Sequence, residues 1–116
     1  MKRKIVFYKG YFREFFDAQE EKVKQKIDFV LDLIRSVDKI PEKFLKHMEG
    51  TEGLYEMRIK VGNNIFRIFC FFDEGNLVVT INGFQKKTDK TPKNEIVKAK
   101  KIKVEYFNSK LDEDAK

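Results

Sequence analysis

Three segments in which apolar residues alternate with other residues restrict what the second half of this sequence can form. They are residues 54–61, 65–72 and 77–84. The separators Gly62-Asn63 and 73–76 are short and contain glycine and asparagine, which is typical of hairpin turns. A two-residue turn that begins with glycine pairs Val61 with Asn64 and so fixes the register. The sequence therefore predicts an antiparallel meander of three strands.

The predicted register places two arginines side by side. The core face of the first hairpin holds Tyr55, Met57, Ile59, Phe66, Ile68 and Cys70. On the other face Arg58 lies directly opposite Arg67, and like charges in that position repel. Such a pair favours an anion held between the two guanidinium groups, whose planar forks suit a phosphate. The alternative is that each arginine pairs with a nearby acid such as Glu49 or Glu56.

The first half of the sequence predicts a strand followed by helix. Residues 4–8 are β-branched and aromatic, as in a short strand. Over residues 11–34 apolar residues recur every three or four positions, which indicates one bent helix or two antiparallel helices. Residues 38–41 end this region, because proline disfavours helical geometry in the residue before it. Residues 44–49 are expected to add a helical turn.

A last helix is expected over residues 92–107, with Thr91 as its cap and Pro92 in its first position. Its apolar side is expected to hold Ile96, Val97, Ala99, Ile102, Val104, Tyr106 and Phe107. This order of elements predicts an α+β fold in a single domain over residues 1–116, with a frayed tail from about residue 108.

Length and charge narrow the possible functions. A chain of 116 residues fits one domain, and its single cysteine, Cys70, lies in an apolar run typical of a reduced core thiol. No apolar stretch has the length of a membrane span or of a signal peptide, so a cytoplasmic protein is expected. The net charge is +6, and residues 86–110 alone carry nine lysines against three acidic residues. Such a region favours a polyanion, although a lysine-rich helix kept for solubility is the alternative.

Lys86 and Lys87 follow the last strand and could approach the arginine pair from its end. Strict alternation places Leu77, Val79 and Ile81 on one face and Thr80, Asn82, Phe84 and Lys86 on the other. Phe69 and Phe71 share the arginine face and are expected to pack under a helix rather than to stack on bases. The sequence contains no metal-ligand cluster, Gly-rich phosphate loop or Ser/His/Asp set, so no metal and no cofactor are expected.

Four runs of residues occur in an order and spacing typical of a known family. They are Gly53-Leu54-Tyr55-Glu56-Met57-Arg58-Ile59, Phe66-Arg67-Ile68, Asn82-Gly83-Phe84-Gln85-Lys86-Lys87, and Lys90-Thr91-Pro92 followed by Glu95-Ile96 and Ala99. Over residues 4–107 the sequence resembles the phage-derived, HigB-like branch of the RelE/HigB toxin superfamily. The resemblance implies a RelE-like, microbial ribonuclease-like fold. It also implies a toxin of a type II toxin–antitoxin pair, which enters the ribosome and cleaves mRNA.

The resemblance assigns catalytic roles to basic residues. Arg58 and Arg67 match strand positions where RelE-like toxins keep basic residues that hold the scissile phosphate. Lys86 or Lys87 matches a basic position at the end of the last strand. These residues are the candidate catalytic set.

The candidate acid or base and the candidate RNA contacts come partly from the resemblance and partly from residue type. Glu56 stands where RelE-type toxins have a lysine that serves as base, and His47 is the only histidine. Glu56 and His47 are therefore the candidate acid or base. Lys60, Lys90 and Lys93 are candidate RNA-binding residues.

The expected reaction is metal-independent attack of a ribose 2′-OH on the adjacent phosphate. The expected partners are mRNA on the ribosome and a cognate helix-turn-helix antitoxin, with no membrane. The alternatives are a non-catalytic nucleic-acid-binding module and a degenerate toxin that only binds its antitoxin. If the arginines hold an anion, Arg67→Ala should leave the fold intact or raise its stability by about 0.3 kcal/mol. The same change should slow cleavage roughly 10²- to 10³-fold.

Overall fold

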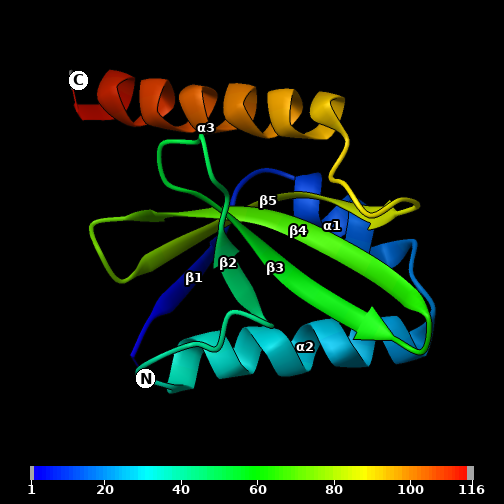
Figure 1. Ribbon diagram of the computed structural model, residues 1–116. Helices are drawn as coiled ribbons and strands as arrows, with labels where there is room; N and C mark the ends of the chain where they lie inside the picture. The colour runs from blue at the N-terminus through cyan, green and yellow to red at the C-terminus, as the bar shows by residue number, and fades with distance from the viewer. Residues whose placement is uncertain (1, 115–116) are drawn as a thin grey trace.

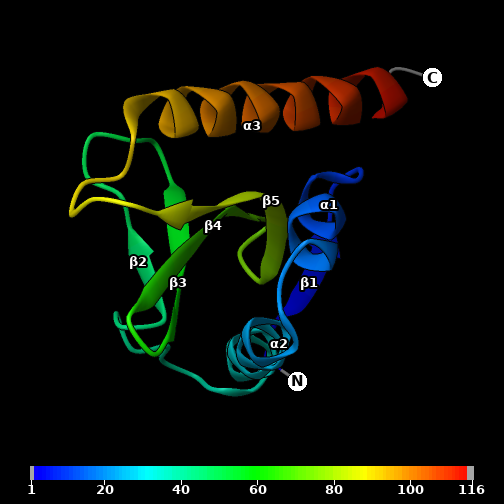
Figure 2. The ribbon, with the colours of Figure 1, turned by 90° about the vertical axis from the view of Figure 1, so that its right-hand side faces the viewer.

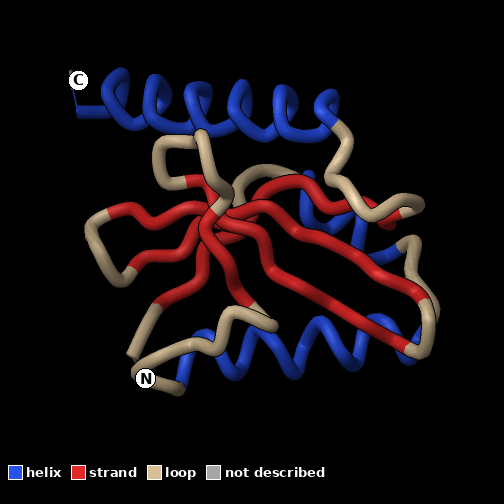
Figure 3. The backbone as a smooth tube through the Cα atoms, in the orientation of Figure 1, coloured by secondary structure: helices blue, strands red, loops and turns tan. Residues whose placement is uncertain are grey.

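The computed structural model describes residues 2–114, which form a five-stranded sheet and three helices. The elements are β1 (Lys4–Phe7), α1 (Tyr11–Asp17), α2 (Glu21–Ser36), β2 (Leu45–His47), β3 (Leu54–Val61), β4 (Asn64–Asp73), β5 (Leu77–Lys86) and α3 (Lys93–Asp114). The strand order is β1-β5-β4-β3-β2, with β1 parallel to β5 and the other neighbours antiparallel. Figures 1 and 3 show the sheet between α2 on one face and α3 on the other.

The β3–β4 hairpin has the predicted register. Val61 pairs with Asn64, and Arg58 pairs with Arg67. Gly62 at the turn has a φ of 60°, a value that glycine adopts without strain. The α+β prediction, with its short N-terminal strand and three-stranded meander, is thus confirmed, and β2 is a further strand at one edge of the sheet.

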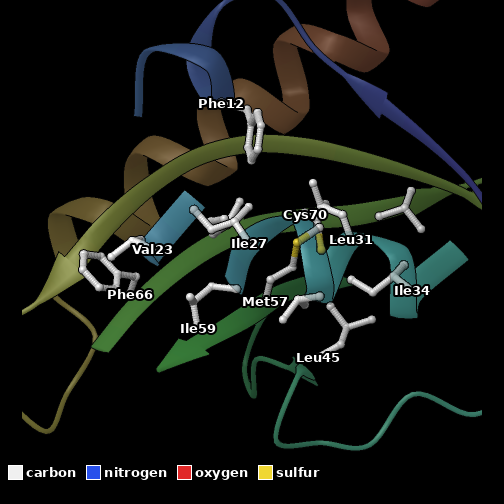
Figure 4. Packing of buried hydrophobic residues seen from close by; sticks show 13 residues of the cluster. Phe12, Val23, Ile27, Leu31, Ile34, Leu45, Met57, Ile59, Phe66 and Cys70 are labelled. Atoms are coloured by element: carbon white, nitrogen blue, oxygen red, sulfur yellow. The ribbon is translucent and has the colours of Figure 1, made fainter. Parts of the chain in front are cut away.

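The sheet is covered by apolar side chains on both faces. The α2 side buries Phe12, Val23, Ile27, Val30, Leu31, Ile34, Leu45, Met57, Ile59, Phe66, Ile68, Cys70 and Val78 (Figure 4). The α3 side buries Leu54, Phe69, Phe71, Val79, Ile81, Ala99 and Ile102. Phe69 and Phe71 are therefore packing residues under α3, as predicted. Cys70 is a fully buried free thiol, and burial raises the pKa of that thiol.

The helical region of the first half is two helices, not one. The chain leaves helical geometry between Asp17 and Glu21, where Gln19 Nε2 donates to the carbonyl of Phe15 at 3.0 Å. This bond satisfies a carbonyl at the end of α1. Figure 2 shows α1 beside β1 and β5, and α2 seen nearly along its axis beneath the sheet.

The expected helical turn at residues 44–49 is wrong, because Leu45–His47 forms β2. The amides of Phe44 and Leu45 donate to the carbonyl of Pro41, so the tight turn comes earlier. Leu45 then pairs with Met57 and is buried in the α2-side core. Pairing with β3 overrides the local pattern here, since strand preference depends on the available neighbours.

Strict alternation along β5 is also wrong. Between Ile68 and Cys70 the register of β4 with β5 shifts, so Gly83 pairs with Ile68 but Thr80 pairs with Cys70. One extra residue of β5 is accommodated in this bulge, which changes the phase of the alternation. As a result Ile81 and Phe84, expected on opposite faces, both pack in the α3-side cluster.

The last helix differs from the prediction at both ends. Pro92 provides the carbonyl that accepts from the amides of Glu95 and Ile96, whereas the Thr91 hydroxyl is bonded elsewhere. The helix then continues to Asp114, beyond the point where fraying was expected. Tyr106 and Lys110 explain this extension, because both bind the carboxylate of Asp73 and tie the helix to the sheet.

Two apolar residues expected on the buried side of α3 face outward instead. Val97 is 50% exposed and Val104 is 59% exposed, while Ala99 and Ile102 make the contact with the sheet. Because α3 carries apolar residues on two faces, the helical period could not be assigned cleanly from the sequence. No helix within residues 2–114 is both long and apolar enough to cross a membrane.

Candidate active site

Arg58, Arg67 and Lys86 lie on one face of three neighbouring strands. Arg58 on β3 is directly opposite Arg67 on β4, and Arg67 is opposite Phe84 on β5. Two residues further along β5, Lys86 lies opposite Ile65 and shares this face. The meander therefore brings together three cations that are far apart in the sequence.

Glu56 places a carboxylate between the two arginines. Its side chain is 8% exposed, and its Oε1 lies 3.4 Å from Nε of Arg58 and 3.4 Å from Nε of Arg67. Its Oε2 accepts a hydrogen bond from Thr91 Oγ1 at 3.3 Å. The two guanidinium groups thus share the carboxylate of Glu56. This arrangement is the predicted alternative in which the arginines pair with a nearby acid. Glu49 is exposed in the turn after β2.

Arg67 is held from several sides. The residue is 8% exposed, its Nη1 donates to the carbonyl of Phe66 at 3.1 Å, and its buried Nε makes no hydrogen bond although Glu56 is near. Burial lowers the pKa of Arg67, Glu56 opposes that shift and Arg58 adds to it. Removing Arg67 would take one of the two neighbouring cations away from the buried carboxylate of Glu56. The expected gain in stability for Arg67→Ala is therefore replaced by an expected loss.

Lys86 lies close enough to Arg58 and Arg67 for their positive charges to act on it. Its Nζ donates to the carbonyl of Asp89 at 2.7 Å, which folds the following loop back over the strand end. Burial lowers the pKa of Lys86, as do the charges of Arg67 and Arg58, while Glu56 acts in the opposite direction. A lysine in this state gives up its proton more readily than an ordinary lysine.

The charges of the cluster do not cancel. Glu56 supplies one negative charge against the positive charges of Arg58, Arg67 and Lys86. Partial burial strengthens this excess, because water screens it less than on an open surface. The cluster can therefore bind an anion, and two arginines with a proton-donating lysine can stabilise charge on a phosphate and supply a proton to a leaving oxygen.

Residues 14–104 match the family described as Phage derived protein Gp49-like (DUF891). The chain belongs to this family. The match contains Glu56, Arg58, Arg67 and Lys86. The phage-derived part of the resemblance stated from the sequence is thereby confirmed.

Solved structures share the fold of this Gp49-like chain. A chain of the archaeal RelE–RelB complex from Pyrococcus horikoshii OT3 is 15% identical, with a TM-score of 0.56 over 75% of this chain and 98% of that chain. A chain of the RelB–RelE antitoxin–toxin complex from Methanococcus jannaschii is 18% identical, with a TM-score of 0.53 over 75% of this chain and 99% of that chain. The fold is therefore RelE-like. No curated protein matches the sequence.

The other predicted site residues of the Gp49-like chain are dispersed. Lys60 is exposed, lies opposite Ile65 and so flanks the cluster on the same face as Arg58. Lys87, Lys90 and Lys93 are exposed in the loop after β5 and at the start of α3.

His47 lies on the opposite face of the sheet. It pairs with Tyr55, and the two rings meet edge to face with centroids 5.1 Å apart. Tyr55 packs against the α2-side core, so the sheet separates the imidazole from Glu56. Of the two candidates for acid or base, only Glu56 is beside the arginines.

Sequence reasoning missed the links between the cluster and α3. The sequence predicts Thr91 as a helix cap, but its hydroxyl donates a hydrogen bond to Glu56 Oε2. Asn82 is 3% exposed, and its Nδ2 donates to Glu95 Oε2 in the first turn of α3 at 3.3 Å. The only signal in the sequence was the proximity of both residues to Lys86, which does not identify a partner. Within residues 2–114, no three His, Cys, Asp or Glu residues form a group that could hold a metal ion.

Proposed function

We propose that this protein is the toxin of a type II toxin–antitoxin pair, in the HigB-like branch, and that it cleaves mRNA on the ribosome. The observation that carries the proposal is the convergence of Arg58, Arg67 and Lys86 around the buried Glu56. The RelE-like fold and the Gp49-like family support the same function. The matched chains come from antitoxin–toxin complexes, which supports an antitoxin as partner.

The reaction follows from the charges of the cluster. The ribose 2′-oxygen attacks the adjacent phosphorus, the bond from phosphorus to the 5′-oxygen breaks, and the products are a 2′,3′-cyclic phosphate and a free 5′-OH. Arg58 and Arg67 stabilise the negative charge that develops on the phosphorane. Lys86 gives a proton to the departing 5′-oxygen, a step that its lowered pKa favours.

We assign Glu56 as the carboxylate that accepts the 2′-OH proton, because it lies beside both arginines. To accept it, Oε2 exchanges its hydrogen bond from Thr91 for one from the ribose, while Oε1 stays with the two arginines. The requirement for a 2′-OH makes the activity specific for RNA.

The remaining lysines would hold the RNA backbone. Lys60 on β3, Lys87 and Lys90 after β5, and Lys93 at the start of α3 are exposed, and they would contribute charge without base recognition. Because the chain offers few groups that read bases, we expect the ribosome to present the mRNA. The site of action is then the cytoplasm, and a cognate helix-turn-helix antitoxin would restrain it.

The test is inducible expression of the full chain without a partner, with growth and transcript 5′ ends followed after induction. Wild type should arrest growth and cut transcripts within translated regions, and Arg58→Ala should do neither. Arg13→Ala is the matched control, because its side chain is 75% exposed on α1, away from the cluster. Normal growth with intact transcripts at high expression of wild type contradicts the proposal.

A degenerate toxin is the second candidate, and Glu56 is the observation that favours it. A carboxylate already shared by Arg58 and Arg67 competes with a substrate phosphate for the same groups. In that case wild type would leave transcripts intact, and only its binding to an antitoxin would remain.

A further inference from the structure

The loop that joins β5 to α3 is held in place by side chains. It spans residues 87–92, and all of its residues except Thr91 are exposed. Among the described residues, no backbone hydrogen bond joins residues 87–91 to another element of the chain. Two side-chain bonds join them instead, one from Lys86 to the loop and one from Thr91 to the sheet. The position of the 87–92 loop therefore depends on these two bonds.

Both bonds of the 87–92 loop end on the candidate active site. The Nζ of Lys86 donates to the carbonyl of Asp89 at 2.7 Å, and the hydroxyl of Thr91 donates to Glu56 Oε2 at 3.3 Å. Lys86 and Glu56 are the two groups that the proposed reaction uses for proton transfer. In the empty protein the loop thus occupies one hydrogen of the lysine and one oxygen of the carboxylate. The loop and a substrate compete for the same two side chains.

The bond from Thr91 is the stronger of the two ties. Its acceptor, Glu56, has a side chain that is 8% exposed and is charged, whereas Asp89 is exposed and offers a neutral carbonyl. A hydrogen bond to a buried, charged acceptor is stronger than one between neutral or exposed groups. Breaking the contact between Thr91 and Glu56 is therefore the main cost of moving the loop.

We propose that the 87–92 loop closes over the arginine cluster in the empty protein and is released when a phosphate binds there. The phosphate attracts the two arginines and Lys86 and repels the carboxylate of Glu56. Glu56 turns away from the arginines and withdraws the acceptor of Thr91, and Lys86 turns from the carbonyl of Asp89 to the phosphate. The inference rests on the proposed function for the identity of the ligand, but not on cleavage.

Two threonines of the same loop provide a matched pair of variants. Thr91→Val keeps the size of the side chain and removes the bond to Glu56. Thr88→Val is the control, because the hydroxyl of Thr88 donates to the carbonyl of Lys90, inside the loop, at 3.0 Å. Thr91→Ser keeps the hydroxyl, so it separates the loss of the bond from any change in packing.

The first measurement is the affinity of each full-length protein for inorganic phosphate at neutral pH and constant ionic strength. Wild type must break the bond between Thr91 and Glu56 when phosphate binds, whereas Thr91→Val has no such bond to break. The variant should therefore bind phosphate roughly three- to tenfold more tightly than wild type. Thr91→Ser and Thr88→Val should bind as wild type does.

The second measurement is the NMR order parameters of the backbone amides of residues 87–91, with and without phosphate. Phosphate should lower them in wild type, and in Thr91→Val they should be low from the start. Equal or weaker phosphate binding by Thr91→Val overturns the proposal, as does absence of phosphate binding in all four proteins. Order parameters that phosphate raises or leaves unchanged in wild type also overturn it. A chain that shows both effects but leaves transcripts intact supports release of the loop and contradicts only the proposed cleavage.

Discussion

Arg67 lies directly opposite Arg58 across the β3–β4 hairpin, and in both residues Nε lies 3.4 Å from the same oxygen of Glu56. The contacts between Glu56 and the two arginines therefore affect both the stability of the fold and the binding of a phosphate. The carboxylate makes it possible to hold two like charges side by side, with Arg67 buried and Arg58 partly exposed. The same carboxylate must share the arginines with any phosphate that binds.

Glu56→Gln separates these two effects. The amide keeps the shape but loses the charge, so the empty protein should lose about 1–3 kcal/mol of unfolding free energy. Added inorganic phosphate should then raise the melting temperature of the variant more than that of wild type, because the arginines have no competing anion. Equal phosphate-induced shifts in the two proteins would argue that the cluster does not bind anions.

We expect the pKa of Lys86 to shift in opposite directions in two variants. Lys86 must be protonated to act. Because its pKa is lowered, cleavage should be lost at a pH below the pKa of an ordinary lysine. Arg58→Ala removes a positive charge, so the pKa of Lys86 should rise. Glu56→Gln removes a negative charge, so that pKa should fall. Because neither variant is expected to cleave, the pKa is measured by NMR titration of the lysine side chain, and the same Lys86 pKa in all three proteins would contradict this account of the cluster.

The contacts between Asp73 and α3 are expected to weaken at acid pH. Its Oδ2 accepts from Lys110 Nζ at 2.9 Å and from Tyr106 at 2.7 Å, and the bond with Lys110 is the main reason that the pKa of Asp73 is lowered. Burial, and then the hydrogen bond that Tyr106 donates to Asp73, raise the pKa of Tyr106 to about 12. A lowered carboxyl pKa adds stability above the unfolded-state value of about 3.9, and this stability is lost as pH falls through the folded value.

Urea unfolding of Asp73→Asn measures that anchor. The variant should be less stable than wild type by about 1 kcal/mol at pH 7, and the difference should shrink as the pH falls below about 4. Glu74→Gln is the control, because Glu74 also contacts Lys110 but its side chain is 75% exposed. A pH-independent difference for Asp73→Asn would assign the effect to packing.

Gly83 is required by the packing of α1 on β5. A Cβ at this position would lie 2.7 Å from Cδ2 and 2.8 Å from Cγ of Phe15. Gly83→Ala should therefore cost about 1–3 kcal/mol, and less when Phe15 is also alanine. Gly10→Ala, where nothing lies within 4 Å, should change the melting temperature much less. Additive effects of the Gly83 and Phe15 changes would rule out the steric account.

The sequence predicted the meander and its arginine pair because a two-residue turn determines the register without help from the rest of the chain. It could not predict β2, whose strand geometry depends on Met57, or the bulge in β5. The predicted buried positions of Val97 and Val104 are wrong, because a helix with two apolar faces has no single periodicity. The sequence does not choose between Glu49 and Glu56 as the acid that pairs with the arginines, because the direction of a side chain does not follow from strand register.

The most direct test of the central claim is the single-turnover rate of mRNA cleavage on programmed ribosomes, measured for wild type and Arg67→Ala. Wild type should produce a 2′,3′-cyclic phosphate, and a single 2′-deoxynucleotide at the cut position should abolish cleavage. Arg67→Ala should lower the melting temperature and slow cleavage roughly 10²- to 10³-fold. A folded Arg67→Ala protein that melts lower but cleaves at nearly the wild-type rate would contradict the account, because Arg67 would then serve only to balance Glu56.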